Sequence, residues 1–228
     1  NTLSYGTEKY YQAEDGLNVV MTIDEVIQHY AEKALASAMK ITKSDRMMCL
    51  VMDPTTGDVL AMVTTPGYDP NDATEPDSKS ELKKFNKLTE KEQVGYLSEM
   101  WRNPIVSDTY EPGSTFKLLT DSAALEEGLT TPTEKFNCTG SINVSGTILH
   151  CGKLSGHGSE TLTQAVGNSC NPVHVQLALR LGIDKFYNYL DLFGVIEKTG
   201  IDYPGETAAI VQSKDTVGQV GLATMGFG

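Results

Sequence analysis

The first 65 residues contain a helical pattern followed by two adjacent strands, and this order restricts the chain to folds that mix helices with antiparallel sheet. Apolar residues recur at helical spacing from Thr22 to Lys40. The run Thr22-Ile23-Asp24-Glu25 has the form of a capping box at the start of that helix. Two apolar stretches, Met47–Asp53 and Asp58–Thr64, flank Pro54-Thr55-Thr56-Gly57, which is typical of a hairpin turn. The pattern predicts an α+β fold.

The rest of the chain predicts further helices with irregular segments between them. Residues 66–110 are only weakly periodic, and we expect a loop with one or two short surface helices. Further elements are predicted from apolar spacing and from Gly and Pro positions: a helix from Ser114 to about Glu127, an irregular hairpin over 136–158, helices over 161–168, 172–181 and 184–193, and a loop from Gly200 that ends in a helix.

Size and charge limit the classes of function. The 228 residues suffice for one large domain or two small ones. The net charge of -12 argues against nucleic acid or an anionic membrane as the main partner. No apolar run reaches the length of about 18 residues that crosses a bilayer. Because the chain begins at Asn1 rather than Met, we expect a processed or cloned piece, and a membrane anchor can lie outside it.

The tetrapeptide Ser-x-x-Lys occurs three times, at Ser37–Lys40, Ser80–Lys83 and Ser114–Lys117. The first copy lies inside the early helix and the second in a charge-rich surface stretch, so we interpret both as ordinary surface sequence. The third follows Pro112-Gly113, which predicts a sharp turn into a helix. Ser114 is therefore expected at a helix N-terminus, where the dipole and free N–H groups favour a developing alkoxide.

Lys117 lies three residues after Ser114 and is expected on the same helix face, within reach of the hydroxyl. A serine hydroxyl needs a base to become a good nucleophile. Lysine can serve if burial and nearby cations lower its pKa from about 10.4 towards 7. The tetrapeptide alone favours another interpretation, an N-cap serine beside an exposed lysine, and a second polar element is needed to favour the catalytic one.

A second polar element, Ser169-Cys170-Asn171, is predicted on a loop between two helices. On such a loop a serine can relay a proton to a leaving group, and an asparagine can hold the amide of a substrate. Ser141-Ile142-Asn143 has the same spacing but lies in the irregular hairpin, and we discount it.

These two elements resemble a known family. Glu111-Pro112-Gly113-Ser114-Thr115-Phe116-Lys117 is similar to the first signature of class B penicillin-binding proteins, and Ser169-Cys170-Asn171 to the second. Four more runs resemble the family in the same order: LNVVMTIDEVIQ from residue 17, VMDPTTGDVLAMVTTPGYDP from residue 51, His157-Gly158, and TGIDYPGE from residue 199. The cysteine pattern and the Ser-Cys-Asn-Pro run resemble those of sporulation members from spore-forming bacteria.

The resemblance implies the transpeptidase fold shared with serine β-lactamases, in which helices sandwich a sheet. Residues 1–20 would be a linker or the end of a preceding pedestal domain, and residues 21–228 a transpeptidase domain incomplete at its C-terminus. Lys198-Thr199-Gly200 spells the family's third motif, but it leads into Ile201-Asp202-Tyr203-Pro204-Gly205, and we interpret it as a chance match. The substrate-carboxylate anchor and one oxyanion donor would then be missing. Loss of one oxyanion donor costs about 100- to 1000-fold in rate, so we predict that 228 residues alone are an inefficient enzyme.

By resemblance, the activity is peptidoglycan D,D-transpeptidation with the catalytic residues Ser114, Lys117, Ser169 and Asn171. Stem peptides would be the substrates, β-lactams would acylate Ser114, and a glycosyltransferase would supply glycan strands. The family further implies a single-pass anchor, the extracytoplasmic face of the membrane, and for the sporulation members a role in the spore cortex. Two alternatives stay open: a serine β-lactamase or carboxypeptidase on the same scaffold, and a non-catalytic penicillin-recognising scaffold protein.

The cysteines predict a possible metal site. Cys49 lies in an apolar strand and is expected to be a buried thiol. Cys138, Cys151, His157 and Cys170 are separated by 13, 6 and 13 residues, and three thiolates with one imidazole suit structural, tetrahedral zinc. Elongation-type relatives carry zinc ligands at similar places. A disulfide between two of the three cysteines, or reduced buried thiols, are the alternatives.

Two further histidines are set aside. His150 adjoins Cys151 and would face the opposite way in an extended strand. His174 is expected on a helix surface.

Overall fold

The computed structural model describes residues 15–228, so most of the linker predicted over residues 1–20 lies outside the described residues. The chain divides into two compact units, one ending at Trp101 and the other formed by Arg102–Gly228. Within residues 15–228, none of the helices is both long and apolar enough to cross a membrane.

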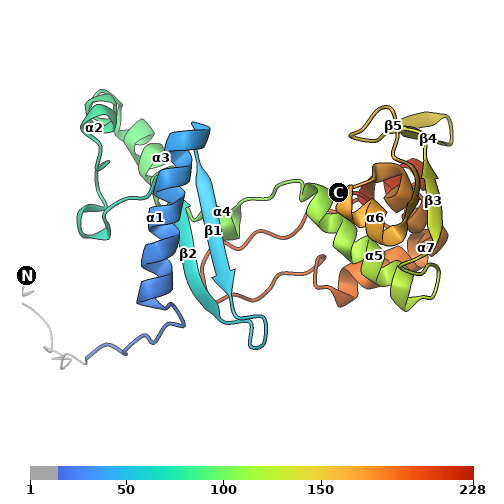
Figure 1. Cartoon of the computed structure of the whole chain (residues 1–228). Helices are drawn as coiled ribbons and strands as arrows, with labels where there is room; N and C mark the ends of the chain where they lie inside the picture. The colour runs from blue at the N-terminus through green and yellow to red at the C-terminus, as the bar shows by residue number, and fades with distance from the viewer. Residues whose placement is uncertain (1–14) are drawn as a thin grey trace, which may run out of the picture. The chain divides into compact units, whose positions relative to one another are not determined.

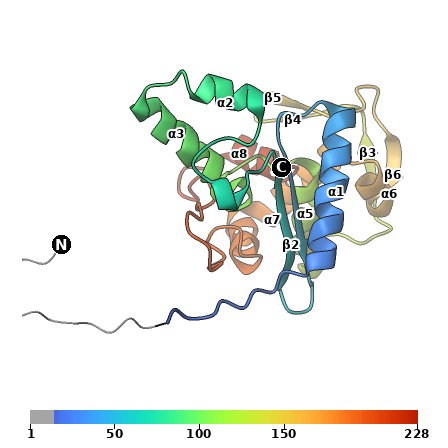
Figure 2. The same ribbon diagram turned by 90° about the vertical axis from the view of Figure 1, so that its left-hand side faces the viewer.

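In the first unit, helix α1 (Glu25–Thr42) lies along the hairpin of β1 (Met47–Met52) and β2 (Val59–Thr65), as Figures 1 and 2 show. One side chain joins the helix to the sheet. Gln28 accepts from the Met62 N–H at 2.9 Å and donates to the Met62 carbonyl at 3.2 Å. The amide thus satisfies both backbone groups of one β2 residue.

The predicted capping box at Thr22 is wrong. The N-cap of α1 is Asp24, whose carboxylate accepts from the N–H groups of Val26 and Ile27. The Thr22 hydroxyl instead donates to the Val59 carbonyl at 2.6 Å. The helix starts later than predicted because the strand engages the threonine and a better-placed acceptor follows it.

The segment after the hairpin is more helical than predicted. It contains the 3-10 turn η1 (Pro70–Asp72) and helices α2 (Lys79–Phe85) and α3 (Glu90–Trp101). Phe85 and Tyr96 hold α2 to α3, with ring centroids 5.4 Å apart in edge-to-face contact. Cys49, predicted to be buried, is only half-buried in β1, because one helix and two strands enclose little volume.

The second unit is built around helix α7 (Asn171–Leu192), which packs against α5 (Lys117–Glu126) and α8 (Gln219–Met225). Phe186, Leu177 and Leu190 on α7 are fully buried and form the centre of the core. The two helices predicted over 172–181 and 184–193 are halves of α7, separated by Gly182 with φ 72° and ψ 168°. Glycine adopts such positive φ at little cost, so the kink falls where the sequence pattern breaks.

The predicted irregular hairpin consists of short antiparallel pairs that contact α7. Strand β3 (Lys135–Cys138) pairs with β6 (Gly158–Thr161), and β4 (Ser141–Val144) pairs with β5 (Thr147–His150). Helix α6 (Leu162–Gly167) follows β6, and α4 (Pro104–Ser107) begins the unit. Helices and antiparallel pairs are thus combined as the α+β prediction requires.

Candidate active site

Ser114 lies in the 3-10 turn η2 (Gly113–Phe116), which leads directly into α5. Gly113 enters the turn with φ 60°, a conformation that glycine accepts readily. The Thr115 hydroxyl closes the turn by donating to the Pro112 carbonyl at 2.8 Å. The turn therefore presents the Ser114 hydroxyl, on an exposed residue, at the start of the helix.

Lys117 is 3% exposed, and its ammonium nitrogen lies among oxygen atoms. The Nζ atom is 3.0 Å from Ser114 Oγ and 2.7 Å from Asn171 Oδ1. It is 2.8 Å from both the hydroxyl and the carbonyl oxygen of Ser169. An ammonium has three N–H donors, so four oxygens exceed its capacity. Hydrogen bonds from Lys117 thus connect the serine turn to the Ser-Cys-Asn loop.

The Ser-Cys-Asn loop joins α6 to α7 and carries an unusual backbone. Ser169 has φ 52°. Its N–H donates to the Val166 carbonyl at 3.0 Å, and the Cys170 N–H donates to the Ala165 carbonyl at 2.9 Å. This pair of hydrogen bonds defines a Schellman end to α6, in which the left-handed position is usually glycine. A serine in that position aims its hydroxyl at Ser114 Oγ, to which it donates at 2.9 Å.

The structure brings together all four side chains that the sequence predicted for catalysis: Ser114, Lys117, Ser169 and Asn171. Asn171 is further fixed because its Nδ2 donates to the His150 carbonyl at 2.9 Å. The other Ser-x-x-Lys copies show no such arrangement among the described residues. Ser37, for example, donates to the Lys33 carbonyl of its own helix at 2.9 Å.

Burial lowers the pKa of Lys117, because a charged amine loses hydration inside the protein. The neighbouring Cys151, Cys170 and Asp121 act in the opposite direction. The net direction is the one that a lysine base requires.

Lys198-Thr199-Gly200 lies in a loop, where its backbone is bound to Glu206. The Thr199 N–H and hydroxyl each donate to Glu206 Oε1 at 2.6 Å, and the Gly200 N–H donates to Glu206 Oε2 at 3.2 Å. These donors are already used, so the segment does not offer a free strand edge to a substrate carboxylate.

The four predicted metal ligands also meet. One ligand atom from each of Cys138, Cys151, His157 and Cys170 lies within 4.8 Å of the others. All three of these cysteines are unpaired thiols, so the disulfide alternative does not describe this structure. Tetrahedral zinc with Zn–S near 2.3 Å and Zn–N near 2.0 Å sets ligand atoms roughly 3.5–4 Å apart. The cluster therefore fits a zinc ion by donor type and approximate spacing.

The thiols of the cluster differ in acidity. Burial opposes ionisation of Cys138, but hydrogen bonds from the backbones of His157 and Gly140 bring its pKa down to about 7. Burial and the neighbouring Glu160 carboxyl raise the pKa of Cys170. Glu160 Oε1 also lies 3.7 Å from His157 Nδ1. Of these two thiols, Cys138 is the one that its surroundings favour as a thiolate.

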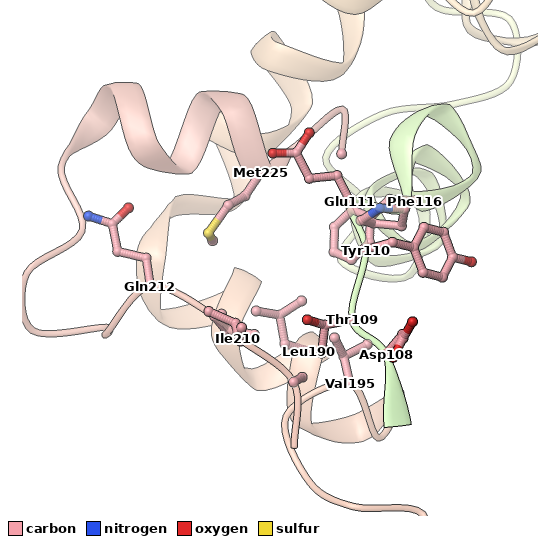
Figure 3. A pocket seen from close by; sticks show the side chains of 14 residues that line it. Asp108, Thr109, Tyr110, Glu111, Phe116, Leu190, Val195, Ile210, Gln212 and Met225 are labelled. Carbon is pink, nitrogen blue, oxygen red and sulfur yellow. The ribbon is translucent and has the colours of Figure 1, made fainter. Parts of the chain in front are cut away.

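A cavity of about 760 Å³ adjoins the serine turn. Figure 3 shows it between Tyr110, which precedes the serine turn, Phe116 at the end of that turn, Leu190 at the end of α7, and the loop at Ile210. Its lining is mainly apolar and includes Pro112 and Phe116, on either side of Ser114.

Sequence reasoning missed a buried polar pair beside the site. His174, predicted on a helix surface, is 0% exposed, and its Nε2 lies 3.2 Å from Asp121 Oδ2. The surface prediction is wrong because that face of α7 packs against α5. The sequence spacing could have indicated burial. Asp121 follows Lys117 by four residues and His174 follows Asn171 by three, so each lies on the same helix face as a predicted catalytic residue.

Comparison with known proteins agrees with this geometry. Residues 47–228 match the family described as the penicillin binding protein transpeptidase domain. The chain is 37% identical to stage V sporulation protein D of Bacillus subtilis, over 97% of this chain and 31% of that protein. It is 32% identical to the peptidoglycan D,D-transpeptidase MrdA of Salmonella typhimurium, over 87% of this chain and 30% of that protein.

Among solved structures, penicillin-binding protein 3 of Mycobacterium tuberculosis in complex with ampicillin superposes with a TM-score of 0.79 at 30% identity, covering 96% of this chain and 44% of the other. The chain belongs to the penicillin-binding protein transpeptidase family, as the two signatures had indicated. It spans about a third of the length of the curated relatives described above.

Proposed function

We propose that the protein is a peptidoglycan D,D-transpeptidase that acts through an acyl-enzyme on Ser114. The observation that carries the proposal is the set of contacts from buried Lys117 Nζ to Ser114 Oγ, Ser169 Oγ and Asn171 Oδ1. A buried amine of lowered pKa beside a serine hydroxyl is an activated nucleophile pair. The names of the relatives support the same reaction class.

In this mechanism Ser114 Oγ attacks the carbonyl carbon of the penultimate D-alanine, and its proton passes to neutral Lys117. The C–N bond then breaks, and the terminal D-alanine leaves with a proton delivered through the Ser169 hydroxyl, which lies 2.9 Å from Ser114 Oγ. Asn171 holds the lysine and the substrate amide. An amine of a neighbouring stem peptide then attacks the ester, which forms the cross-link and frees Ser114.

The test is labelling with fluorescent penicillin, read by intact mass and by a time course. The β-lactam ring opens on the serine without losing a fragment, so we expect one whole-antibiotic adduct, located on Ser114. Ser114→Ala should abolish it, while Ser37→Ala, in a chance copy of the tetrapeptide, should label as the wild type does. Rapid loss of the adduct would instead indicate a β-lactamase, and no adduct on the intact parent protein would favour a non-catalytic scaffold.

We also propose that Cys138, Cys151, His157 and Cys170 hold a structural zinc ion. Support comes from three buried thiols and one imidazole gathered within 4.8 Å. With four protein ligands, the metal would have no open position for substrate. Its effect would be to fix Cys170, and with it the two residues of the active site that flank Cys170.

Elemental analysis of protein purified without chelator tests this proposal, with one zinc per chain expected. Removal of the metal should lower the melting temperature and slow penicillin labelling together. Cys138→Ala should reproduce both effects, whereas Cys49→Ala, outside the cluster, should retain the zinc. Metal-free protein of unchanged stability would refute the site.

The finer biological assignment is also a proposal. We propose a role in spore cortex synthesis, at the extracytoplasmic face of the membrane and with a glycosyltransferase partner. The name of the sporulation protein among the relatives supports the link to sporulation. Inactivation of the gene should leave vegetative growth unchanged and should reduce cross-linking of cortex peptidoglycan, measured by muropeptide analysis. A defect confined to vegetative wall would refute the sporulation role.

A further inference from the structure

One helical turn away from the Lys117–Asn171 contact lies a second polar pair that the mechanism above does not use. Asp121 follows Lys117 by one turn on α5, and His174 follows Asn171 by about one turn on α7. His174 is 0% exposed and Asp121 is 6% exposed. The His174 Nε2 atom lies 3.2 Å from each carboxylate oxygen of Asp121. The pair therefore ties α5 to α7 inside the core.

The other ring nitrogen of His174 reaches the backbone of the Ser-Cys-Asn loop. Nδ1 lies 2.7 Å from the Cys170 carbonyl oxygen, whereas the main-chain N–H of His174 reaches the same oxygen at 3.4 Å. Because a carbonyl only accepts, Nδ1 carries a proton. The ring thus makes the short hydrogen bond at the first turn of α7, a helix whose N-cap has no side-chain cap.

Asp121 determines which way the ring faces. With Nδ1 as a donor, Nε2 bonds to the carboxyl group of Asp121 through a second proton that lies on one of the two groups. Whether that second proton lies on His174 or on Asp121, the imidazole ring keeps its Nδ1–H directed at the Cys170 carbonyl oxygen. A role in packing alone does not explain the pair, because apolar residues of similar volume stabilise a core at least as well as a buried polar pair.

We propose that His174 is a positioning residue for acylation, anchored by Asp121, which fixes the Cys170 carbonyl and so holds the left-handed conformation of Ser169. The Cys170 N–H already bonds to Ala165 at 2.9 Å, so the histidine completes the restraint on that residue from its carbonyl side. The inference rests on the proposed function, since it assigns a role within the same site.

The kinetic test compares rates of penicillin labelling per folded molecule. His174→Ala should label about 10- to 100-fold more slowly, the usual cost of losing a group that orients a reacting residue. His174→Asn places an amide N–H near the position of Nδ1 and should recover most of the rate. Leu177→Ala is the matched control, because Leu177 is fully buried on the same helix, three residues further from the loop, and its side chain has no polar atom. It should lose stability and keep the rate.

A spectroscopic test keeps the inference separate from the proposed activity. In protein with 15N-labelled histidine, one imidazole should show a proton on Nδ1 that exchanges slowly with water and whose resonance moves in Asp121→Asn. The Cα and Cβ shifts of Ser169 should leave the left-handed range in His174→Ala and return in His174→Asn. If wild-type protein is not acylated by penicillin, the proposed function is refuted, but the role of His174 in the conformation of Ser169 is not. Unchanged Ser169 shifts, or a folded His174→Ala that labels at the wild-type rate, would overturn the role of His174.

Discussion

Replacing Lys117 by methionine separates the chemical role of the lysine from its structural role. Methionine fills a similar volume with no polar atom, so the variant removes the amine and leaves the packing. The lysine contacts four oxygens. Two of them, Ser114 Oγ and Ser169 Oγ, remain bonded to each other and lie on exposed residues. The Asn171 side-chain oxygen and the Ser169 carbonyl lose their donor.

The cost in stability follows from those two oxygens. A buried acceptor without a partner costs about 1–3 kcal/mol, so the upper bound for two is roughly 6 kcal/mol. The actual loss should be smaller, because Ser169 is exposed and water can reach it, and because the variant no longer buries an amine. We expect about 1–3 kcal/mol, or roughly 2–12 °C in melting temperature for a domain of this size.

The cost in acylation should be far larger than the loss of stability implies. Removing a general base typically slows a reaction by about 100- to 10,000-fold. The assay is the second-order rate of penicillin labelling, with near-ultraviolet circular dichroism to measure the folded fraction. A folded Lys117→Met variant that labels within about 10-fold of the wild type would refute the lysine as base, since this is below the range expected for general-base loss.

The pH dependence follows from the direction of the pKa shift. Burial lowers the pKa of Lys117 from 10.5, so the neutral amine should appear, and labelling should level off, below pH 10.5. The penalty for burying the charged amine is fully present at low pH, where the lysine is protonated in both folded and unfolded chains. It is lost as pH rises through the folded pKa towards 10.5. The stability of wild type relative to Lys117→Met should therefore increase with pH in that window.

Substitutions at three other positions, two of them with a matched control, test the surroundings of the site. Ser169→Gly should stabilise the protein by roughly 0.5–1 kcal/mol, because glycine tolerates the left-handed conformation, and should still slow labelling, while Ser169→Ala should slow labelling without that gain. A Cβ on Gly156 would lie 2.2 Å from the Cys138 carbonyl oxygen, so Gly156→Ala should lower the melting temperature and weaken zinc retention. Gly152→Ala, where a Cβ meets nothing within 4 Å, is its control. Thr161→Ala removes a capping box and should cost about 1 kcal/mol in thermal unfolding.

The sequence predicted the helices and the first hairpin because those elements depend on local periodicity and turn residues. The kink in α7 was predictable for the same reason, since Gly182 interrupts the apolar spacing. The N-cap of α1 was not, because Thr22 competes with Asp24 for the role and the choice depends on a bond to Val59 in a distant strand. Pairing of β3 with β6 across the 19 residues between Cys138 and Gly158 likewise depends on tertiary contacts.

At the site, the sequence predicted the residues with recognisable spacing and missed those that act through packing. Ser114 and Lys117 are three residues apart, so helical geometry alone brings them together. Their contact with Ser169 spans more than 50 residues, and the family resemblance, rather than local pattern, indicated it. His174 was misplaced because an isolated polar residue on a helix is usually exposed, and burial of this one depends on Asp121 across the helix interface.

One residue that conflicts with local backbone preference lies where the chemistry is proposed. Among the described residues, Lys43, Ser145 and Ser169 have positive φ without being glycine. Lys43 ends α1, and Ser145 forms the β4–β5 turn with Gly146, where positive φ at both positions suits a tight hairpin. Ser169 also occupies an ordinary glycine position, the end of α6, but its side chain is bonded to the buried lysine. Glycine would fold as well or better there and would remove the hydroxyl, so the site retains a conformational cost that only a role for that hydroxyl explains.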